Sequence, residues 1–327
     1  MVNFRIMQMM KGAKILVDNC ANVKPGESVL VVADTAMPFS ITKAIALVAQ
    51  ERGADTQIMI IEQRKFHNEE PPRCAAEAMK AAHVVFEVSS KGFYHTQARN
   101  DANKAGARYL TLCELTEDLM ISGPMEADYV KIKPFVDKLT EKLKKGKSLK
   151  VTSPGGTSFT ADISGRTARA LTGVVHNPGE FGAPPDIEAS ISPLEGTANG
   201  ILVIDGYGVD VGLINDPIRV TFKNGLAVGI EGGAEAKMLR DRLASANDPK
   251  IYNFGEFGIG LNPECRMSAC LLDTEGKAGT AHVALGSSPV GSGGTVRASA
   301  HLDQVFWKPT VEVDGEILLK EGELLVK

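Results

Sequence analysis

Short apolar runs alternate with helix-forming segments through the first third of the chain, and this alternation constrains the fold more than any other feature. The first apolar run, residues 29–32, follows a Lys-Pro-Gly turn and precedes an Ala-rich helical segment at residues 40–51. The pattern then repeats, with apolar runs at 56–61, 83–88 and 108–112 and helical segments at 75–82 and 96–105. Strands separated by helices favour a parallel sheet with helices on both faces. We therefore predict an α/β, Rossmann-like N-terminal domain over residues 1–147.

The pattern changes in the second half of the chain. Short β-branched or alternating segments now lie between glycine-rich turns, at residues 149–152, 158–163, 201–205, 217–223 and 226–230. The last two are joined by Asn224-Gly225, which is typical of a two-residue β-hairpin turn. A hydrophobic content of 43% in 327 residues is enough for two cores. We therefore predict an α+β C-terminal domain over residues 148–327, built mainly on antiparallel sheet and holding the metal site described below.

Charge and hydropathy exclude several classes of protein. A formal net charge of −4 and a pI near 5.9 leave no basic excess, so we expect no nucleic-acid partner. No apolar run is long enough to span a bilayer, and Arg5 and Lys11 interrupt the N-terminal apolar residues. We therefore expect no membrane partner and a cytoplasmic location. Neither a Gly-x-Gly-x-x-Gly nor a Gly-Lys-Ser/Thr motif follows the first strand, which disfavours nucleotide binding.

Histidines and carboxylates lie close together in the last third of a chain that has six histidines. Glu256, His282, His301 and Asp303 offer the oxygen and nitrogen ligands that borderline divalent metals prefer. His301 and Asp303 are two residues apart, so on a strand their side chains point to the same face. A lone histidine in an apolar strand, such as His282, is more often a core residue, but the neighbouring His-x-Asp pair favours a ligand. The pattern predicts a metalloenzyme.

Four other charged residues are weaker candidates. Glu188 and Glu195 are near enough in sequence to the expected site to act as a general base. Arg166 and Arg169 could bind a substrate carboxylate, because a guanidinium group forms paired hydrogen bonds with carboxylates. Surface salt bridges are the commoner use of such arginines, and we expect that use for both.

Five segments of the C-terminal half carry further information through their order. They are residues 152–157 (TSPGGT), 177–184 (NPGEFGAP), 255–263 (GEFGIGLNP), 279–286 (GTAHVALG) and 293–303, which ends in SAHLD. Together they resemble the thermophilic aminopeptidase T and aminopeptidase S metallopeptidases. Residues 23–27 (VKPGE) also resemble the start of that family, so the likeness covers nearly the whole chain.

The resemblance implies a dinuclear metal site that releases an N-terminal amino acid from a peptide. The matching residues are Glu180 and Glu256 as catalytic, metal-binding carboxylates, with His282, His301 and Asp303 as the remaining metal ligands. It also implies two ions of Zn, Co or Mn, a small-molecule or short-peptide substrate, and a homodimer. Two adjacent cations can hold a hydroxide and polarise the scissile carbonyl. On this basis we predict a metal-dependent hydrolase.

One segment departs from the aminopeptidase pattern. Those enzymes have a tyrosine a few residues after the histidine that matches His282, whereas residues 286–289 read GSSP here. The resemblance extends to the dihydroxypyridine dioxygenases, which use one Fe(II) and keep the pair that matches His301 and Asp303. A ring-cleaving dioxygenase is therefore the alternative function. We expect a histidine at position 256 in such enzymes, so Glu256 favours the hydrolase. A further alternative is a non-catalytic protein that binds a small ligand.

Overall fold

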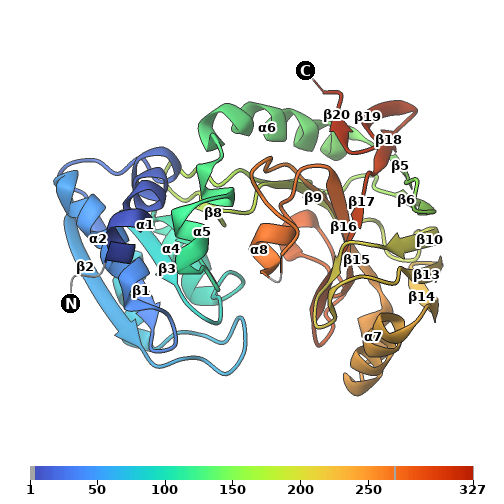
Figure 1. Cartoon of the computed structure of the whole chain (residues 1–327), viewed down its shortest axis with the longest axis horizontal. Coiled ribbons are helices and arrows are strands. Elements are labelled where there is room, and N and C mark those ends of the chain that lie inside the picture. Colours follow the sequence, from blue (N-terminus) through green and yellow to red (C-terminus); the bar gives the residue numbers. More distant parts are fainter. Residues whose placement is uncertain (1–3, 269, 327) are drawn as a thin grey trace. The chain divides into compact units, whose positions relative to one another are not determined.

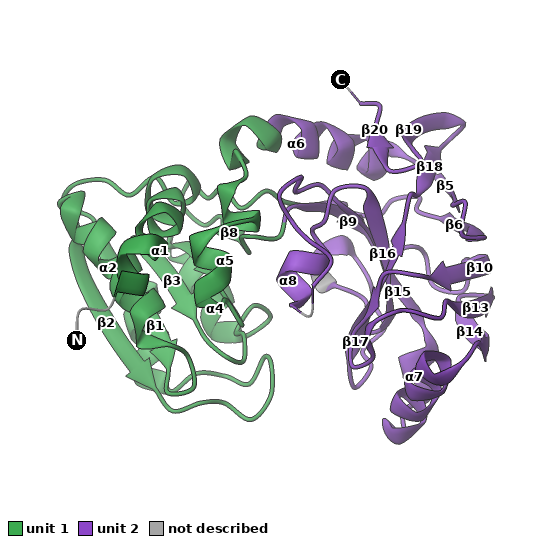
Figure 2. Cartoon of the chain, in the orientation of Figure 1, with its two compact units in different colours: residues 1–133, 171–186 green, residues 134–170, 187–327 purple. Residues whose placement is uncertain are grey.

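The computed structural model describes residues 4–268 and 270–326 and divides into two compact units (Figure 2). Unit 1 consists of residues 1–133 and 171–186, and unit 2 consists of residues 134–170 and 187–327. The chain therefore passes between the units after residues 133, 170 and 186. The domain boundary after residue 147 stays a prediction, because these units follow compactness and a short segment of the second half belongs to unit 1.

Unit 1 is built on a parallel sheet with the strand order β2-β1-β3-β4-β8 (Figure 1). Residue Val29 of β1 pairs with Thr56 of β2 on one side and with Val84 of β3 on the other. The strands are β1 (Ser28–Asp34), β2 (Asp55–Ile61), β3 (Val84–Val88), β4 (Arg108–Thr111) and β8 (Phe181–Gly182). The predicted α/β, Rossmann-like architecture of the N-terminal region is confirmed.

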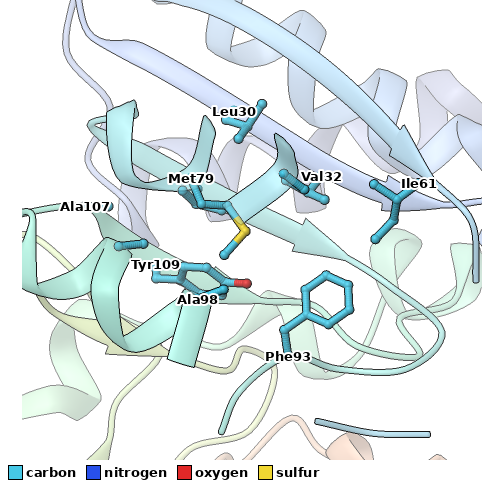
Figure 3. Close-up of a cluster of buried hydrophobic side chains, with 11 residues drawn as sticks. Leu30, Val32, Ile61, Met79, Phe93, Ala98, Ala107 and Tyr109 are labelled. Carbon is cyan, nitrogen blue, oxygen red and sulfur yellow. The ribbon is translucent and has the colours of Figure 1, made fainter. Parts of the chain in front are cut away.

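Helices cover both faces of this sheet. Leu30 and Val32 point to one face, where they pack with Met79 of α3 in a buried cluster (Figure 3). Val29 and Val31 point to the other face and are fully buried too. The helices are α1 (Phe4–Lys14), which continues as a π-helical segment (Ile15–Cys20), α2 (Phe39–Glu51), α3 (Arg73–Ala81), α4 (Gln97–Lys104) and α5 (Glu117–Ile121), followed by a 3-10 turn (Pro124–Glu126).

Unit 2 contains two sheets whose strands pair antiparallel, as the sequence predicts. Sheet B has the order β14-β13-β10-β6-β5-β18-β19-β20. Its strands are β5 (Ser148–Thr152), β6 (Ser158–Asp162), β10 (Asn199–Ile204), β13 (Ile218–Lys223), β14 (Leu226–Glu231), β18 (Thr310–Val313), β19 (Glu316–Lys320) and β20 (Glu323–Leu324). Sheet C has the order β12-β11-β17-β16-β15-β9-β7. Its strands are β7 (Arg169–Leu171), β9 (Glu188–Ile191), β11 (Tyr207–Gly208), β12 (Gly212–Leu213), β15 (Phe254–Gly260), β16 (Thr280–Gly286) and β17 (His301–Trp307).

Helices are fewer in this half of the chain. They are α6 (Tyr129–Lys145), which begins in unit 1, α7 (Ala234–Ser245), α8 (Leu271–Thr274) and two 3-10 turns (Pro249–Tyr252 and Val290–Ser292). Within the part of the chain that the structure describes, no helix has the length and apolar character needed to cross a membrane.

The predicted hairpin between β13 and β14 is confirmed. Asn224 and Gly225 have φ angles of 49° and 75°, so both central residues of the turn adopt the left-handed conformation that a type I′ turn needs. Asn-Gly is the pair that takes this conformation at least cost.

Strand β15 has one face in the aromatic core of unit 2 and carries Glu256 on its other face. Phe254 and Phe257 of β15 pack against Phe159 of sheet B, with ring centroids 5.4 Å and 6.0 Å away. The register shifts between Phe254 and Glu256, which lets Phe254 and Phe257 share one face although they are three residues apart. From Glu256 onward side chains alternate, so Glu256 and Gly258 point away from Phe257 and from sheet B. The aromatic core therefore fixes which face of sheet C presents the acidic residue.

Candidate metal centre

Strands β9, β15, β16 and β17 place acidic and imidazole side chains on one face of sheet C. Gly258 on β15 pairs with His282 on β16, and Ala284 pairs with both Glu256 and Asp303. Directly paired residues of antiparallel strands point to the same face, and residues two apart on a strand share that face. The shared face therefore holds Glu188, Glu256, His282, His301 and Asp303.

Three of these side chains converge closely enough to hold one metal ion. One ligand atom from each of Glu256, His301 and Asp303 lies within 4.8 Å of the other two. His301 Nε2 is 3.2 Å from Glu256 Oε2 and 3.3 Å from Asp303 Oδ1. Glu256 and Asp303 are buried, with 4% and 6% of their surface exposed, while His301 is half-buried. The three residues form a compact set of one nitrogen and two carboxylate ligands, which we call the triad.

The loop after β16 orients the imidazole of the triad. His301 Nδ1 donates a hydrogen bond of 2.7 Å to the carbonyl oxygen of Ser287. With its hydrogen at Nδ1, a neutral His301 presents the lone pair of Nε2 to Glu256 and Asp303. Such a hydrogen bond to the far nitrogen is the usual way in which proteins fix a metal-binding histidine.

A second pair lies beside the triad. His282 Nε2 is 3.3 Å from Glu188 Oε2 and 3.8 Å from Asp303 Oδ1, and both partners of the His282–Glu188 pair are buried. The ring of His282 lies over Gly258, where a Cβ atom would come within 3.0 Å of ring atoms Cε1 and Nε2. The glycine therefore makes room for the imidazole.

The charges of the site hold the two carboxylates of the triad ionised. Burial alone would raise the pKa of Glu256, but the hydrogen bond and charge of His301 and the charge of Arg169 lower it to about 2. Burial also opposes ionisation of Asp303, and His301 outweighs it, so that the pKa of Asp303 is lowered. Burial disfavours the protonated form of His301, yet the two carboxylates raise its pKa well above the usual range. Burial raises the pKa of Glu188, an effect that His282 partly offsets.

These residues fit a divalent cation. Glu256 Oε1, Asp303 Oδ1 and His282 Nδ1 are buried and have no hydrogen-bond partner among the described residues. Buried polar atoms without partners are costly, and a bound cation would satisfy the two carboxylate oxygens. A cation would also replace the proton that the two carboxylates stabilise on His301. Imidazole and carboxylate ligands suit ions such as Fe(II), Mn(II) and Zn(II).

Two other candidates from the sequence, Glu180 and Glu195, have hydrogen-bond partners of their own. Glu180 belongs to unit 1, where its carboxylate accepts hydrogen bonds from the backbone N–H and the side-chain amide of Asn177. Within unit 2 the structure thus brings four of the five predicted ligands together. Glu180 belongs to a turn of unit 1, and its role as a ligand stays a prediction. Glu195 accepts hydrogen bonds from Thr295, and its other oxygen pairs with Arg166, so it is a structural partner of the loop after β16.

The sequence does not place two residues of the site. It offers Glu188 as a candidate general base but gives no signal that Glu188 lies beside His282. It predicts a surface salt bridge for Arg169. The Arg169 Nη1 atom instead lies 4.0 Å from Glu256 Oε1, and 23% of its side chain is exposed. The pairing of β7 and β9 in sheet C brings both residues to the site, and short strands such as β7 leave no periodic pattern in the sequence.

Comparison with known proteins decides the family. The family model described as 2,5-dihydroxypyridine 5,6-dioxygenase matches residues 13–326. The chain belongs to this family. A curated family member, the 2,5-dihydroxypyridine 5,6-dioxygenase of Pseudomonas putida, is 31% identical over 198 residues, which are 60% of this chain and 55% of the relative. The chain thus spans about half the length of the curated relative that it matches.

Solved structures show the same fold. The structure of the 2,5-dihydroxypyridine dioxygenase of P. putida matches with a TM-score of 0.85 and 21% identity, over 100% of this chain and 99% of that one. AmpT from Thermus thermophilus matches with a TM-score of 0.69 and 16% identity, over 98% and 99% of the two chains. The dioxygenase and AmpT therefore share the architecture of this chain.

The main functional prediction, a metal-dependent hydrolase of the aminopeptidase type, was wrong. The chain belongs to a dioxygenase family, and the match over residues 13–326 overturns the aminopeptidase-type hydrolase and protease. Glu256 was given too much weight, because carboxylates bind metals in oxygenases as well as in hydrolases. The missing tyrosine at residues 286–289 was the better signal.

Proposed function

We propose that the protein is a ring-cleaving dioxygenase that uses one Fe(II) ion and a small dihydroxylated aromatic substrate of the dihydroxypyridine type. The family match supports the reaction class. The convergence of Glu256, His301 and Asp303 within 4.8 Å is the observation that carries the proposal for a single metal ion. Imidazole and carboxylate ligands that leave other positions open are the kind of site that Fe(II) oxygenases use.

In this proposal the triad binds the ion, and the neighbouring pair, His282 and Glu188, accepts a proton from the substrate. Fe(II) would supply the redox chemistry that O2 needs to react with an aromatic ring. Ser287 orients His301 through the hydrogen bond to Nδ1, and Glu256 and Asp303 supply the oxygen ligands. His282 Nε2, 3.3 Å from Glu188 Oε2, can accept the proton that a ring hydroxyl loses and hold it between the two groups. The burial of this pair keeps bulk water from competing for that proton.

The test is oxygen uptake by enzyme loaded with Fe(II) without air. With 2,5-dihydroxypyridine as substrate, the wild-type protein should consume O2, and Asp303→Asn should lower the rate by at least about 100-fold, because it removes a charged metal ligand. Asp241→Asn is the matched control, since Asp241 is exposed on α7 and pairs with Lys237. No uptake by the wild-type protein with a panel of dihydroxylated rings would refute the proposal. The expected homodimer is a separate proposal, which sedimentation of the full chain tests.

A further inference from the structure

Arg169 lies beside the triad, and among the described residues no group forms a hydrogen bond with its guanidinium. Its Nη1 atom is 4.0 Å from Glu256 Oε1, which is beyond hydrogen-bond distance. Arg166 and Arg297, in contrast, hold the loop formed by residues 287–300: Arg166 contacts Gly293 O and Glu195, and Arg297 donates to Ser288 O and Gly294 O. Within residues 4–268 and 270–326, the guanidinium of Arg169 therefore keeps its donors available.

The same loop passes beside Arg169. A Cβ atom at Gly291 would lie at an ordinary contact distance of 3.5 Å from Cδ and 3.7 Å from Nε of Arg169, so the loop borders the arginine side chain. The Nη1 end is directed toward Glu256, whose Oε1 atom is buried and has no hydrogen-bond partner. A largely buried arginine whose donors make no hydrogen bond suits the binding of a ligand, because less side-chain entropy is lost on binding than for an exposed side chain.

A buried hydroxyl on the same face adds an independent sign of a ligand. Ser190 on β9 pairs with Gly258, which also pairs with His282, so its side chain points to the face of the triad. Ser190 is fully buried, and its Oγ has no hydrogen-bond partner in the described chain. A buried hydroxyl without a partner is costly, and a polar ligand would satisfy it.

We propose that Arg169 is a specificity-determining residue that binds an oxyanion of the ring substrate beside the triad, with Ser190 as a second hydrogen-bonding group. This rests on the proposed ring-cleaving function. The oxyanion is either an ionised ring hydroxyl or a carboxylate attached to the ring, because a guanidinium fork matches both. The alternative role of Arg169 is to balance the charge of Glu256, in which case its loss would weaken metal binding and leave substrate selection unchanged.

Ligand binding without turnover distinguishes these roles. The full-length protein is loaded with Zn(II), kept without air, and titrated with three rings: hydroquinone, 2,5-dihydroxypyridine and gentisate, which is a dihydroxybenzene with a carboxylate. Arg169→Gln should weaken gentisate binding about 10- to 100-fold, as expected for a charged hydrogen bond. If a ring oxygen is the anion, binding of 2,5-dihydroxypyridine should fall by a similar factor. Arg169→Lys keeps the charge without the fork, so it should give an intermediate loss.

Controls separate this inference from the proposed function. Arg219→Gln, an exposed substitution on β13 of sheet B, should change no affinity and no Zn(II) content. Three results would overturn the role of Arg169: equal affinities in Arg169→Gln and wild type, loss of Zn(II) in Arg169→Gln, or no binding of any ring to the wild-type protein. Arginine-dependent binding together with no O2 uptake by the Fe(II) enzyme would instead refute the dioxygenase proposal alone.

Discussion

Replacing Gly258 by alanine should displace His282 and disable the site without touching a metal ligand of the triad. The new Cβ atom would come within 3.0 Å of Cε1 and Nε2 of the imidazole, so the ring must move by about 1 Å to reach ordinary contact distance. His282 cannot move that far and stay 3.3 Å from Glu188. Overpacking costs about 1–3 kcal/mol. Separating the buried His282–Glu188 pair adds about 1 kcal/mol, so we expect Gly258→Ala to lower the free energy of unfolding by about 2–4 kcal/mol.

Urea unfolding of the two variants Gly258→Ala and Gly229→Ala measures this effect against a matched control. Gly229 lies on β14, and an added Cβ atom would meet Thr221 at an ordinary 3.7 Å. Gly229→Ala should therefore be neutral or stabilise the protein by about 0.4–1 kcal/mol, through the loss of glycine's freedom in the unfolded chain. Gly258→Ala should also slow O2 uptake strongly, because the proton acceptor has moved. Equal stability and activity of the two variants would refute the account of the His282 position.

Three further predictions concern charge. Asp303→Asn should lose metal, with a metal affinity at least about 100-fold lower in equilibrium dialysis; retention of one ion per chain would remove Asp303 from the triad. In the metal-free protein burial lowers the pKa of His301, but Asp303 and Glu256 outweigh burial and raise it, so binding a cation should release a proton and the metal affinity should rise with pH while free His301 is protonated; an affinity independent of pH would contradict this. In unit 1, burial raises the pKa of Glu87 to about 7 despite hydrogen bonds from Phe93 N and Tyr109 OH. A raised pKa stabilises the fold below the unfolded value of 4.5, and this stability is lost as the pH rises through about 7. The wild-type protein should lose about 3 kcal/mol between pH 4.5 and 8, and Glu87→Gln should show no such loss in urea unfolding.

The elements that could be predicted are those whose pattern is local. The apolar run of β1 and the helix α2 were found within one or two residues, because strand and helix periodicity and the Lys-Pro-Gly turn are signals of adjacent residues. The return of residues 171–186 to unit 1 could not be predicted, since β8 is two residues long and its pairing with β4 joins distant parts of the chain. Helix α1 was also missed, because its polar and apolar residues give no clear stripe.

The site was predictable where its residues share one strand. His301 and Asp303 are two apart on β17, so their common face followed from the spacing alone. Glu180 belongs to unit 1, where its carboxylate bonds to Asn177 within its own turn, and its role as a ligand stays a prediction. Arg169 could not be placed, because its approach to Glu256 depends on the position of β7 at the edge of sheet C. The roles of the predicted ligands stay predictions until metal binding is measured.

The source of the oxygen atoms in the product tests the central claim most directly. The Fe(II)-loaded protein is supplied with 2,5-dihydroxypyridine and isotopically labelled O2, and the product is weighed by mass spectrometry. The account predicts an opened ring that contains both atoms of the labelled O2. A product whose new oxygen comes from water, or an unchanged ring, would contradict it.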